Sequence, residues 1–282
     1  MTKTIFFGSS SYSLIILESL LKLSDFPVLA VVTKPDMPVG RQQKITQNPV
    51  AKYTNDHQLP LLQPVDFDPE FIQKLQSLEP DLILIVAYGP PYFTQVMIDI
   101  PTYKIVNIHP SPLPRYRGAT PGPWQIINGE TKSAVTFFQI DALPDHGPLI
   151  AQIPFDISPT ETANSFYQKA FSLAAQNLST VLSSYIKNSQ KLTLQNHTQK
   201  SYFPKFTKDS AKIDWSWAPA KTERFVRALN PWPVAWTYIK NQQEQQLSMK
   251  IFSFNTKPIE VQIEGKNKTL WSEISKYYQI VK

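Results

Sequence analysis

The sequence contains no cysteine, which excludes a disulfide framework, a thiolate nucleophile and every zinc site built with sulfur ligands. Histidine is scarce as well. The four histidines are far apart in the chain, so a metal site made of imidazoles alone is not expected; they are His57, His109, His146 and His197. We therefore expect whatever chemistry the chain performs to need no metal.

Long apolar runs are also missing. No apolar run reaches the roughly 18 residues that a membrane-spanning helix needs, and residues 1–3 lead directly into an apolar strand without the core of a signal peptide. The chain has 282 residues, of which 42% are hydrophobic and 18% are charged, which is typical of a soluble globular protein. We expect a cytoplasmic protein without membrane contact, and the length favours two domains.

Acidic residues are few in the last third of the chain. Residues 200–282 carry 14 lysines and arginines against 7 acidic residues, whereas residues 1–199 carry 14 against 15. A basic module beside a nearly neutral one indicates an anionic partner, most often nucleic acid. A basic surface that is merely well solvated is the open alternative.

Apolar strands alternate with helices in the first 200 residues. Helices are predicted at 13–23 and 69–78, between strands predicted at 4–10, 28–33, 59–62, 82–89 and 104–108. Strand, helix and strand in this order form βαβ units, which predict a mostly parallel sheet. A strand at 134–140, its antiparallel return at 148–155 and a helix over about 160–186 complete this part.

From about residue 202 the sequence becomes aromatic, basic and irregular. A short helix at 220–230 precedes three alternating segments, at 234–239, 248–254 and 259–264. Short alternating strands in a basic tail are typical of a small β-barrel. The sequence thus predicts an α/β domain over residues 1–200, and a linker with a smaller C-terminal β-barrel domain over residues 201–282.

The stretch NIHPSPLPRYRG (107–118) places three prolines just after a histidine. Each proline lacks an amide donor and disfavours helix in the residue before it, so the stretch is predicted to be a stiff, extended loop. It begins at the end of a predicted strand, where open α/β sheets bind their ligands. The strand ends at Gly8, at Tyr88 and Gly89, and at Asn107 to His109 are expected to meet at one crevice.

Asn107 and His109 are separated by one residue, so on an extended chain both side chains point to the same side. An amide donor and an imidazole together can bind a developing oxyanion and move a proton, which acyl transfer requires. A carboxylate could orient the imidazole. Both Asp141 and Asp145, in the turn DALPDHG (141–147), are candidates, and their spacing does not choose between them.

NIHPSPLPRYRGATP resembles the N-x-H-x-S-x-L-P-x-[RWY]-x-G signature of the 10-formyltetrahydrofolate-dependent formyltransferases, and DALPDHG resembles the second motif of that family. The resemblance implies a Rossmann-like, mostly parallel α/β formyltransferase domain followed by an OB-like β-barrel. It also implies catalytic roles for Asn107, His109 and Asp145, and so favours Asp145 over Asp141.

The resemblance further implies binding residues. It places folate against Tyr88, Gly89, Ser111, Pro112, Leu113 and Pro114. KPDMPVGRQQK (34–44) is similar to the basic loop that relatives acting on tRNA use against the acceptor end, which assigns tRNA binding to Arg41 and Lys44. AKIDWS and ERFVRALNPWPVAW resemble the sequence that leads into the C-terminal barrel, and the chain departs from the family pattern at Pro112, Leu143, Pro144 and His146.

The expected function is formyl transfer from 10-formyltetrahydrofolate to the α-amino group of methionine on initiator methionyl-tRNA, for translation initiation. The enzyme is expected to be a cytoplasmic monomer that needs no metal. Two alternatives remain open: a sugar-nucleotide N-formyltransferase without need of the basic tail, and a non-catalytic RNA-binding protein on the same fold.

Overall fold

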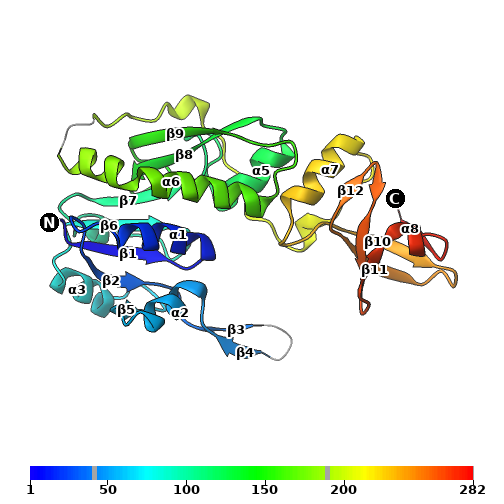
Figure 1. Ribbon diagram of the computed structural model, residues 1–282, viewed down its shortest axis with the longest axis horizontal. Helices are drawn as coiled ribbons and strands as arrows, with labels where there is room; N and C mark the ends of the chain where they lie inside the picture. Colours follow the sequence, from blue (N-terminus) through cyan, green and yellow to red (C-terminus); the bar gives the residue numbers. More distant parts are fainter. Residues whose placement is uncertain (40–42, 188–190, 282) are drawn as a thin grey trace. The chain divides into compact units, whose positions relative to one another are not determined.

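The computed structural model describes residues 1–39, 43–187 and 191–281. The chain forms two compact units, and most of their helices and strands are labelled in Figure 1. The first unit comprises Met1–Arg117, Ala134–Phe155 and Gln168–Ser201. The second comprises Gly118–Ser133, Asp156–Tyr167 and Tyr202–Lys282.

The first unit is built on a seven-stranded sheet with the strand order β5-β2-β1-β6-β7-β8-β9. The strands are β1 (Thr4–Gly8), β2 (Val28–Val32), β5 (Leu61–Leu62), β6 (Leu82–Val86), β7 (Ile105–His109), β8 (Lys132–Gln139) and β9 (Leu149–Asp156). All pairings from β5 to β7 are parallel, whereas β7 and β8 are antiparallel. Every residue of β1 and β6 is buried, as the continuous apolar sequences predict, and the mostly parallel α/β sheet is confirmed.

Among the described residues, the helices that accompany this sheet are α1 (Ser11–Leu20), α2 (Pro49–Asp56), α3 (Pro69–Ser77), α4 (Gln95–Ile98) and α6 (Ala163–Ile186). Side chains of Ser10, Asn48 and Asp68 cap α1, α2 and α3, and proline begins the latter two. The strand β1 ends at a glycine because α1 starts close to it: a Cβ on Gly8 would lie 2.6 Å from Cβ of Ser13.

The basic segment predicted as a loop contains two short strands, β3 (Met37–Val39) and β4 (Lys44–Thr46), which pair antiparallel. Lys44 therefore lies on an exposed strand, and its partner in the prediction, Arg41, falls outside the described residues. None of the helices in the described ranges is long and apolar enough to cross a membrane.

The second unit contains an antiparallel five-stranded sheet with the order β15-β14-β11-β10-β16. Its strands are β10 (Trp236–Asn241), β11 (Gln246–Ile251), β14 (Glu260–Ile263), β15 (Lys268–Leu270) and β16 (Tyr278–Ile280), accompanied by α8 (Trp271–Ile274) and the short pair β12 (Phe254–Asn255) and β13 (Lys257–Pro258). This sheet confirms the smaller C-terminal β-domain. Its edge strands β15 and β16 do not pair with each other in the described chain, so the barrel is open.

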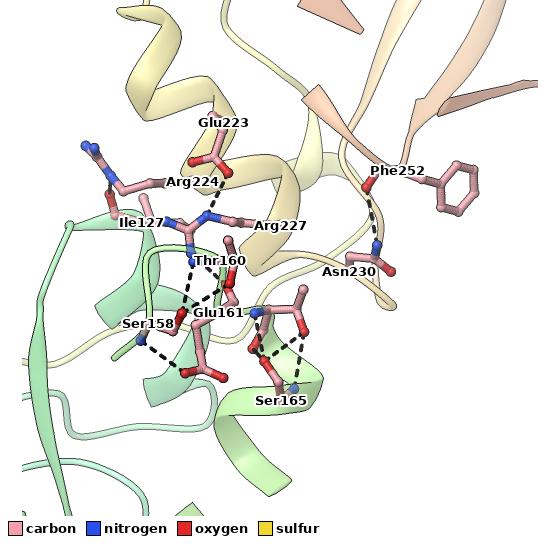
Figure 2. A network of polar contacts seen from close by, with 11 residues as sticks. Ile127, Ser158, Thr160, Glu161, Ser165, Glu223, Arg224, Arg227, Asn230 and Phe252 are labelled. Carbon is pink, nitrogen blue, oxygen red and sulfur yellow. Dashed lines mark hydrogen bonds and ion pairs between the residues drawn. The ribbon is translucent and has the colours of Figure 1, made fainter. Parts of the chain in front are cut away.

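Two earlier segments of the chain also belong to the second unit, where they meet α7 (Pro219–Ala228). Figure 2 shows the polar contacts that hold them. Arg224 Nε donates to the carbonyl oxygen of Ile127 at 3.0 Å, at the end of α5 (Pro121–Ile127), and Arg227 donates to the carbonyl oxygen of Glu161 at 2.6 Å. Arg227 is itself oriented by Glu223, whose carboxylate lies 2.7 Å away. Two arginines on one helix thus fix two distant segments.

Candidate active site

Three neighbouring parallel strands bring the expected residues to one edge of the sheet. The registers pair Gly8 with Val86, and Ile85 with Asn107, so the carboxyl ends of β1, β6 and β7 lie side by side. Asn107 and His109 form the end of β7, and Tyr88 follows the end of β6 by two residues. The first unit thus carries its candidate chemistry where open α/β sheets bind ligands.

His109 is buried, and Asn107 beside it is half-buried. His109 Nε2 donates to the carbonyl oxygen of Tyr116 at 3.0 Å, since a carbonyl can only accept. The side-chain amide of Asn107 has no hydrogen-bond partner among the described residues, and its partial exposure leaves it able to meet a ligand. The strand end therefore presents one fixed imidazole and one unengaged amide.

Asp145, rather than Asp141, lies beside His109. Asp145 Oδ1 is 3.8 Å from His109 Nδ1, and the two side chains are 15% and 8% exposed. This distance is longer than a hydrogen bond, so the carboxylate acts on the imidazole through its charge. Asp141 instead pairs with His146, with 2.6 Å between Oδ2 and Nδ1. The geometry separates two aspartates that sequence spacing could not.

The proline-rich segment after His109 is held by hydrogen bonds from side chains of β8 and β9. Ser111 and Leu113 are buried, and their carbonyl oxygens accept hydrogen bonds from Thr136 Oγ1 at 2.6 Å and Gln152 Nε2 at 2.7 Å. The Ser111 hydroxyl donates to the carbonyl oxygen of Arg115 at 2.8 Å. Pro112 and Pro114 alternate with these buried residues and are half-exposed. The segment is a rigid wall whose two prolines face outward.

Tyr88 is a core residue. Its ring packs edge-on against Phe7, 5.2 Å between centroids, and its hydroxyl is buried without a hydrogen-bond partner. Burial raises the pKa of Tyr88 to about 12. Lys34 Nζ lies 4.0 Å above the ring, and burial lowers the pKa of this ammonium group. Gly89 has φ +75° and open space where a side chain would begin.

Sequence reasoning considered Arg117 only as a possible anion contact and missed Gln195; both are buried next to the Asp145 turn. Gln195 Nε2 donates to the carbonyl oxygens of Asp145 at 3.0 Å and Gly147 at 2.7 Å, and Gln195 Oε1 accepts from Arg117 at 2.6 Å. Burial lowers the pKa of Arg117, while Asp145 and Asp141 oppose that shift. A lone glutamine in an irregular stretch carries no sequence signal for this role.

No cluster of three or more metal-ligating side chains occurs in the parts of the chain that the structure covers. The residues that meet at the end of β7 offer an amide, an imidazole and a carboxylate, with a rigid wall beside them. Such a set can stabilise a developing negative charge on oxygen and transfer a proton.

Comparisons with known proteins identify the family of this chain. Residues 2–182 match the formyl transferase family and residues 205–274 match the formyl transferase C-terminal domain. The chain is 36% identical over 250 residues to a methionyl-tRNA formyltransferase of Chloroflexus aggregans, covering 88% of this chain and 80% of that protein. It is 35% identical over 234 residues to the methionyl-tRNA formyltransferase of Legionella pneumophila strain Paris, covering 83% and 74%.

Solved structures show the same fold at low sequence identity. The methionyl-tRNA formyltransferase from Clostridium thermocellum superposes with a TM-score of 0.58 at 12% identity, over the whole of both chains. A 4-N formyltransferase from Francisella tularensis gives a TM-score of 0.68 at 16% identity, over 90% of this chain and 98% of that one. With the family matched over both parts of its sequence, this chain belongs to the formyl transferase family.

Proposed function

We propose that this protein transfers the formyl group of 10-formyltetrahydrofolate to the α-amino group of methionine on initiator methionyl-tRNA, for translation initiation. The observation that carries the proposal is the convergence of Asn107, His109 and Asp145 at the end of β7. The relatives that match most of this chain at about 35% identity are named methionyl-tRNA formyltransferases, which supports this choice of acceptor.

The bound folate supplies an activated formyl carbon, and the three side chains handle charge and protons around it. Asn107 donates from its free amide to the formyl oxygen as negative charge develops there. His109, protonated on Nδ1, stabilises the same charge, and Asp145 stabilises the imidazolium. The attacking amine loses a proton and the released folate nitrogen gains one, so the reaction consumes no proton overall. His109 and Asp145 assist the movement of this proton.

The residues around this set suit a folate and a tRNA. Pro112 and Pro114 offer the outward surface of the folate wall, held by Ser111 and Leu113, while Gly89 leaves room for close approach. Tyr88, next to Gly89 in the chain, is buried in the core. Arg41, Lys44 and the basic residues of 201–282 bind tRNA phosphates, so residues 1–200 supply the chemistry and residues 201–282 much of the tRNA affinity.

A sugar-nucleotide acceptor is the second candidate, because sugar N-formyltransferases share the fold. One of them, the sugar 3N-formyl transferase WlaRD, superposes with a TM-score of 0.60 at 19% identity. The fold alone therefore does not distinguish a sugar nucleotide from methionyl-tRNA as the acceptor. The excess of basic residues in 200–282 favours tRNA, since a sugar nucleotide would leave most of them without a partner.

The test offers the purified chain 10-formyltetrahydrofolate with methionyl-tRNA in one arm and amino-sugar nucleotides in the other. We expect formylmethionyl-tRNA in the first arm and no formylated sugar in the second. Binding of the tRNA should weaken steeply as salt rises. Tight tRNA binding without turnover, unchanged in His109→Ala, would instead identify a non-catalytic RNA-binding protein.

A further inference from the structure

We propose that Gln195 and Ser201 are positioning residues that hold the two groups facing the ring nitrogens of His109. Both lie in the segment 191–201 that follows α6, far from the sequence motifs of the site. The proposal rests on the proposed role of His109 in formyl transfer, and adds residues that set the geometry without touching the substrates.

The turn that carries Asp145 needs to be held. Asp145 has φ +51°, in the left-handed region that is unfavourable for a residue with a side chain. Gln195 uses both hydrogens of its amide on this turn, donating to the carbonyl oxygens of Asp145 and Gly147. Arg117 fixes the orientation of that amide, because a guanidinium only donates and must therefore face Oε1.

The turn on the other side of His109 is held by the same segment. Tyr116, whose carbonyl oxygen accepts from His109 Nε2, also has a left-handed backbone, with φ +61°. Its amide donates to Ser201 Oγ at 2.9 Å, and the amide of Arg117 donates to the carbonyl oxygen of Ser201 at 2.9 Å. Ser201 thus holds the acceptor for one ring nitrogen, while Gln195 holds the carboxylate near the other.

The segment itself is anchored to the sheet. Thr193 and Leu149, at the start of β9, exchange two backbone hydrogen bonds of 2.8 and 2.9 Å. Gln195 and Ser201 follow within the same segment. Both turns are therefore linked, through this segment, to the sheet that also carries His109. A buried amide with all its partners satisfied is a rigid support, and its loss leaves the Asp145 turn free to shift.

The main test is Gln195→Met, which keeps the length of the side chain and removes both donors. We expect kcat to fall about 10- to 100-fold, with KM for both substrates within about twofold, because a misplaced carboxylate affects the transition state more than binding. Gln195→Glu keeps an acceptor for Arg117 but cannot donate when ionised, and should show a similar loss. Ser201→Ala should show a smaller loss, because the backbone contact of Ser201 remains.

The matched control is Gln125→Met. Gln125 is also fully buried, and its amide donates to the carbonyl oxygen of Pro121 at 3.1 Å and accepts from Ser133 at 2.6 Å, in the second unit. We expect it to lower the unfolding temperature comparably and to leave kcat within about twofold per folded molecule. An equal loss of kcat in both variants would overturn the proposal, since any buried amide would then do the same.

The decisive comparison repeats Gln195→Met and Gln195→Glu in an Asp145→Asn background. If Gln195 acts through the Asp145 carboxylate, its removal costs little further kcat there; a full additional loss would overturn the proposal. The imidazole NMR signals of His109, identified by their loss in His109→Asn, give a readout without substrates. They should shift in Gln195→Met but not in Gln125→Met, and unchanged signals would contradict the positioning role. A wild-type chain inactive on methionyl-tRNA would reject the proposed acceptor and leave this NMR result standing.

Discussion

Two aspartate and histidine pairs share the turn 141–147, and the closer pair is not the one beside the candidate chemistry. Asp141 and His146 are 2.6 Å apart and 38% and 30% exposed, whereas Asp145 and His109 are 3.8 Å apart and 15% and 8% exposed. Water and salt screen the more exposed pair, while the half-buried Asp145 carboxylate acts on the buried imidazole of His109 through a lower dielectric. Burial and neighbouring groups therefore identify the candidate site better than the ion-pair distance does.

The exposed pair has a different setting. His146 stacks on His197, 4.0 Å between ring centroids, and His197 Nδ1 accepts from Arg117 at 2.9 Å. The same guanidinium nitrogen, Nη2 of Arg117, also donates to Gln195 Oε1. The departure of His146 from the family pattern is thus accommodated by a histidine stack at the rim of the turn.

The largest expected effect comes from substitutions that remove the negative charge of one aspartate in each pair. Asp145→Asn should lower kcat for formyl transfer by about 10³- to 10⁴-fold, because the imidazolium of His109 loses its counter-charge. Asp141→Asn should change kcat by less than about threefold. Steady-state kinetics of both variants decide this; similar losses would mean that the exposed pair also takes part in the reaction.

The next effect concerns Asn107, which lies in β7 close to His109 and so belongs to the surroundings of the Asp145–His109 pair. Asn107→Ala should lower kcat by about 10²- to 10³-fold with little change in KM, as the loss of an oxyanion donor does. Asn107→Asp is the matched variant, since its carboxylate retains the size but repels the developing charge. Turnover of Asn107→Ala close to wild type would remove this residue from the mechanism.

A third variant disturbs both pairs through the turn they share. A Cβ on Gly147 would collide with the carbonyl oxygen of Gln139, so Gly147→Ala should destabilise the fold by about 1–3 kcal/mol and displace Asp145. We expect kcat to fall about tenfold. Gly265→Ala is the control for a loss of stability alone: it has open space around it, but alanine strains a backbone with φ +73°, so the unfolding temperature should fall while kcat stays within about twofold. An equal fall of kcat in the two variants would argue against displacement of Asp145 as the cause.

The smallest effect concerns His197, which stacks on His146 of the more exposed pair, and the pH dependence of stability that it causes. Burial, then the positive charges of His146, Arg117 and Lys200, lower the pKa of His197 from its ordinary 6.5, and Asp141 opposes this. The unfolded chain therefore binds this proton more readily, so the stability contributed by neutral His197 is complete above pH 6.5 and is lost as the pH falls toward the lowered value. In thermal melts, the unfolding temperature of His197→Gln should fall less than that of the wild type as the pH is lowered over this range. Equal falls would exclude protonation of His197 as the cause.

The sequence predicted the part of the site that depends on local pattern. Continuous apolar strands and the order of strands and helices placed Asn107 and His109 at a strand end, and this is where they lie. The helix α2 was missed because it is short and polar, although Asn48 and Pro49 form a start signal. The strands β3 and β4 were missed because a proline-rich basic stretch reads as a loop.

The approach of Asp145 to His109 could not be read from the sequence. β8 runs antiparallel to β7 and pairs Gln139 with Val106, so the turn 141–147 begins at the opposite end of β7 from His109 and has to fold back along the strand. Gln195 left no signal either, because its partners at the turn are backbone carbonyls, which every residue type provides. Contacts of this kind depend on the tertiary fold, not on side-chain pattern.

The hydrogen bond from His109 to Tyr116 also restricts how protons move through the site. A carbonyl cannot donate, so in neutral His109 the lone pair is at Nδ1, on the side of Asp145. The ring cannot pass a proton from one nitrogen to the other as a two-ended relay. Any proton that His109 accepts and later returns travels through the same atom, so uptake and release at this imidazole follow one another in time.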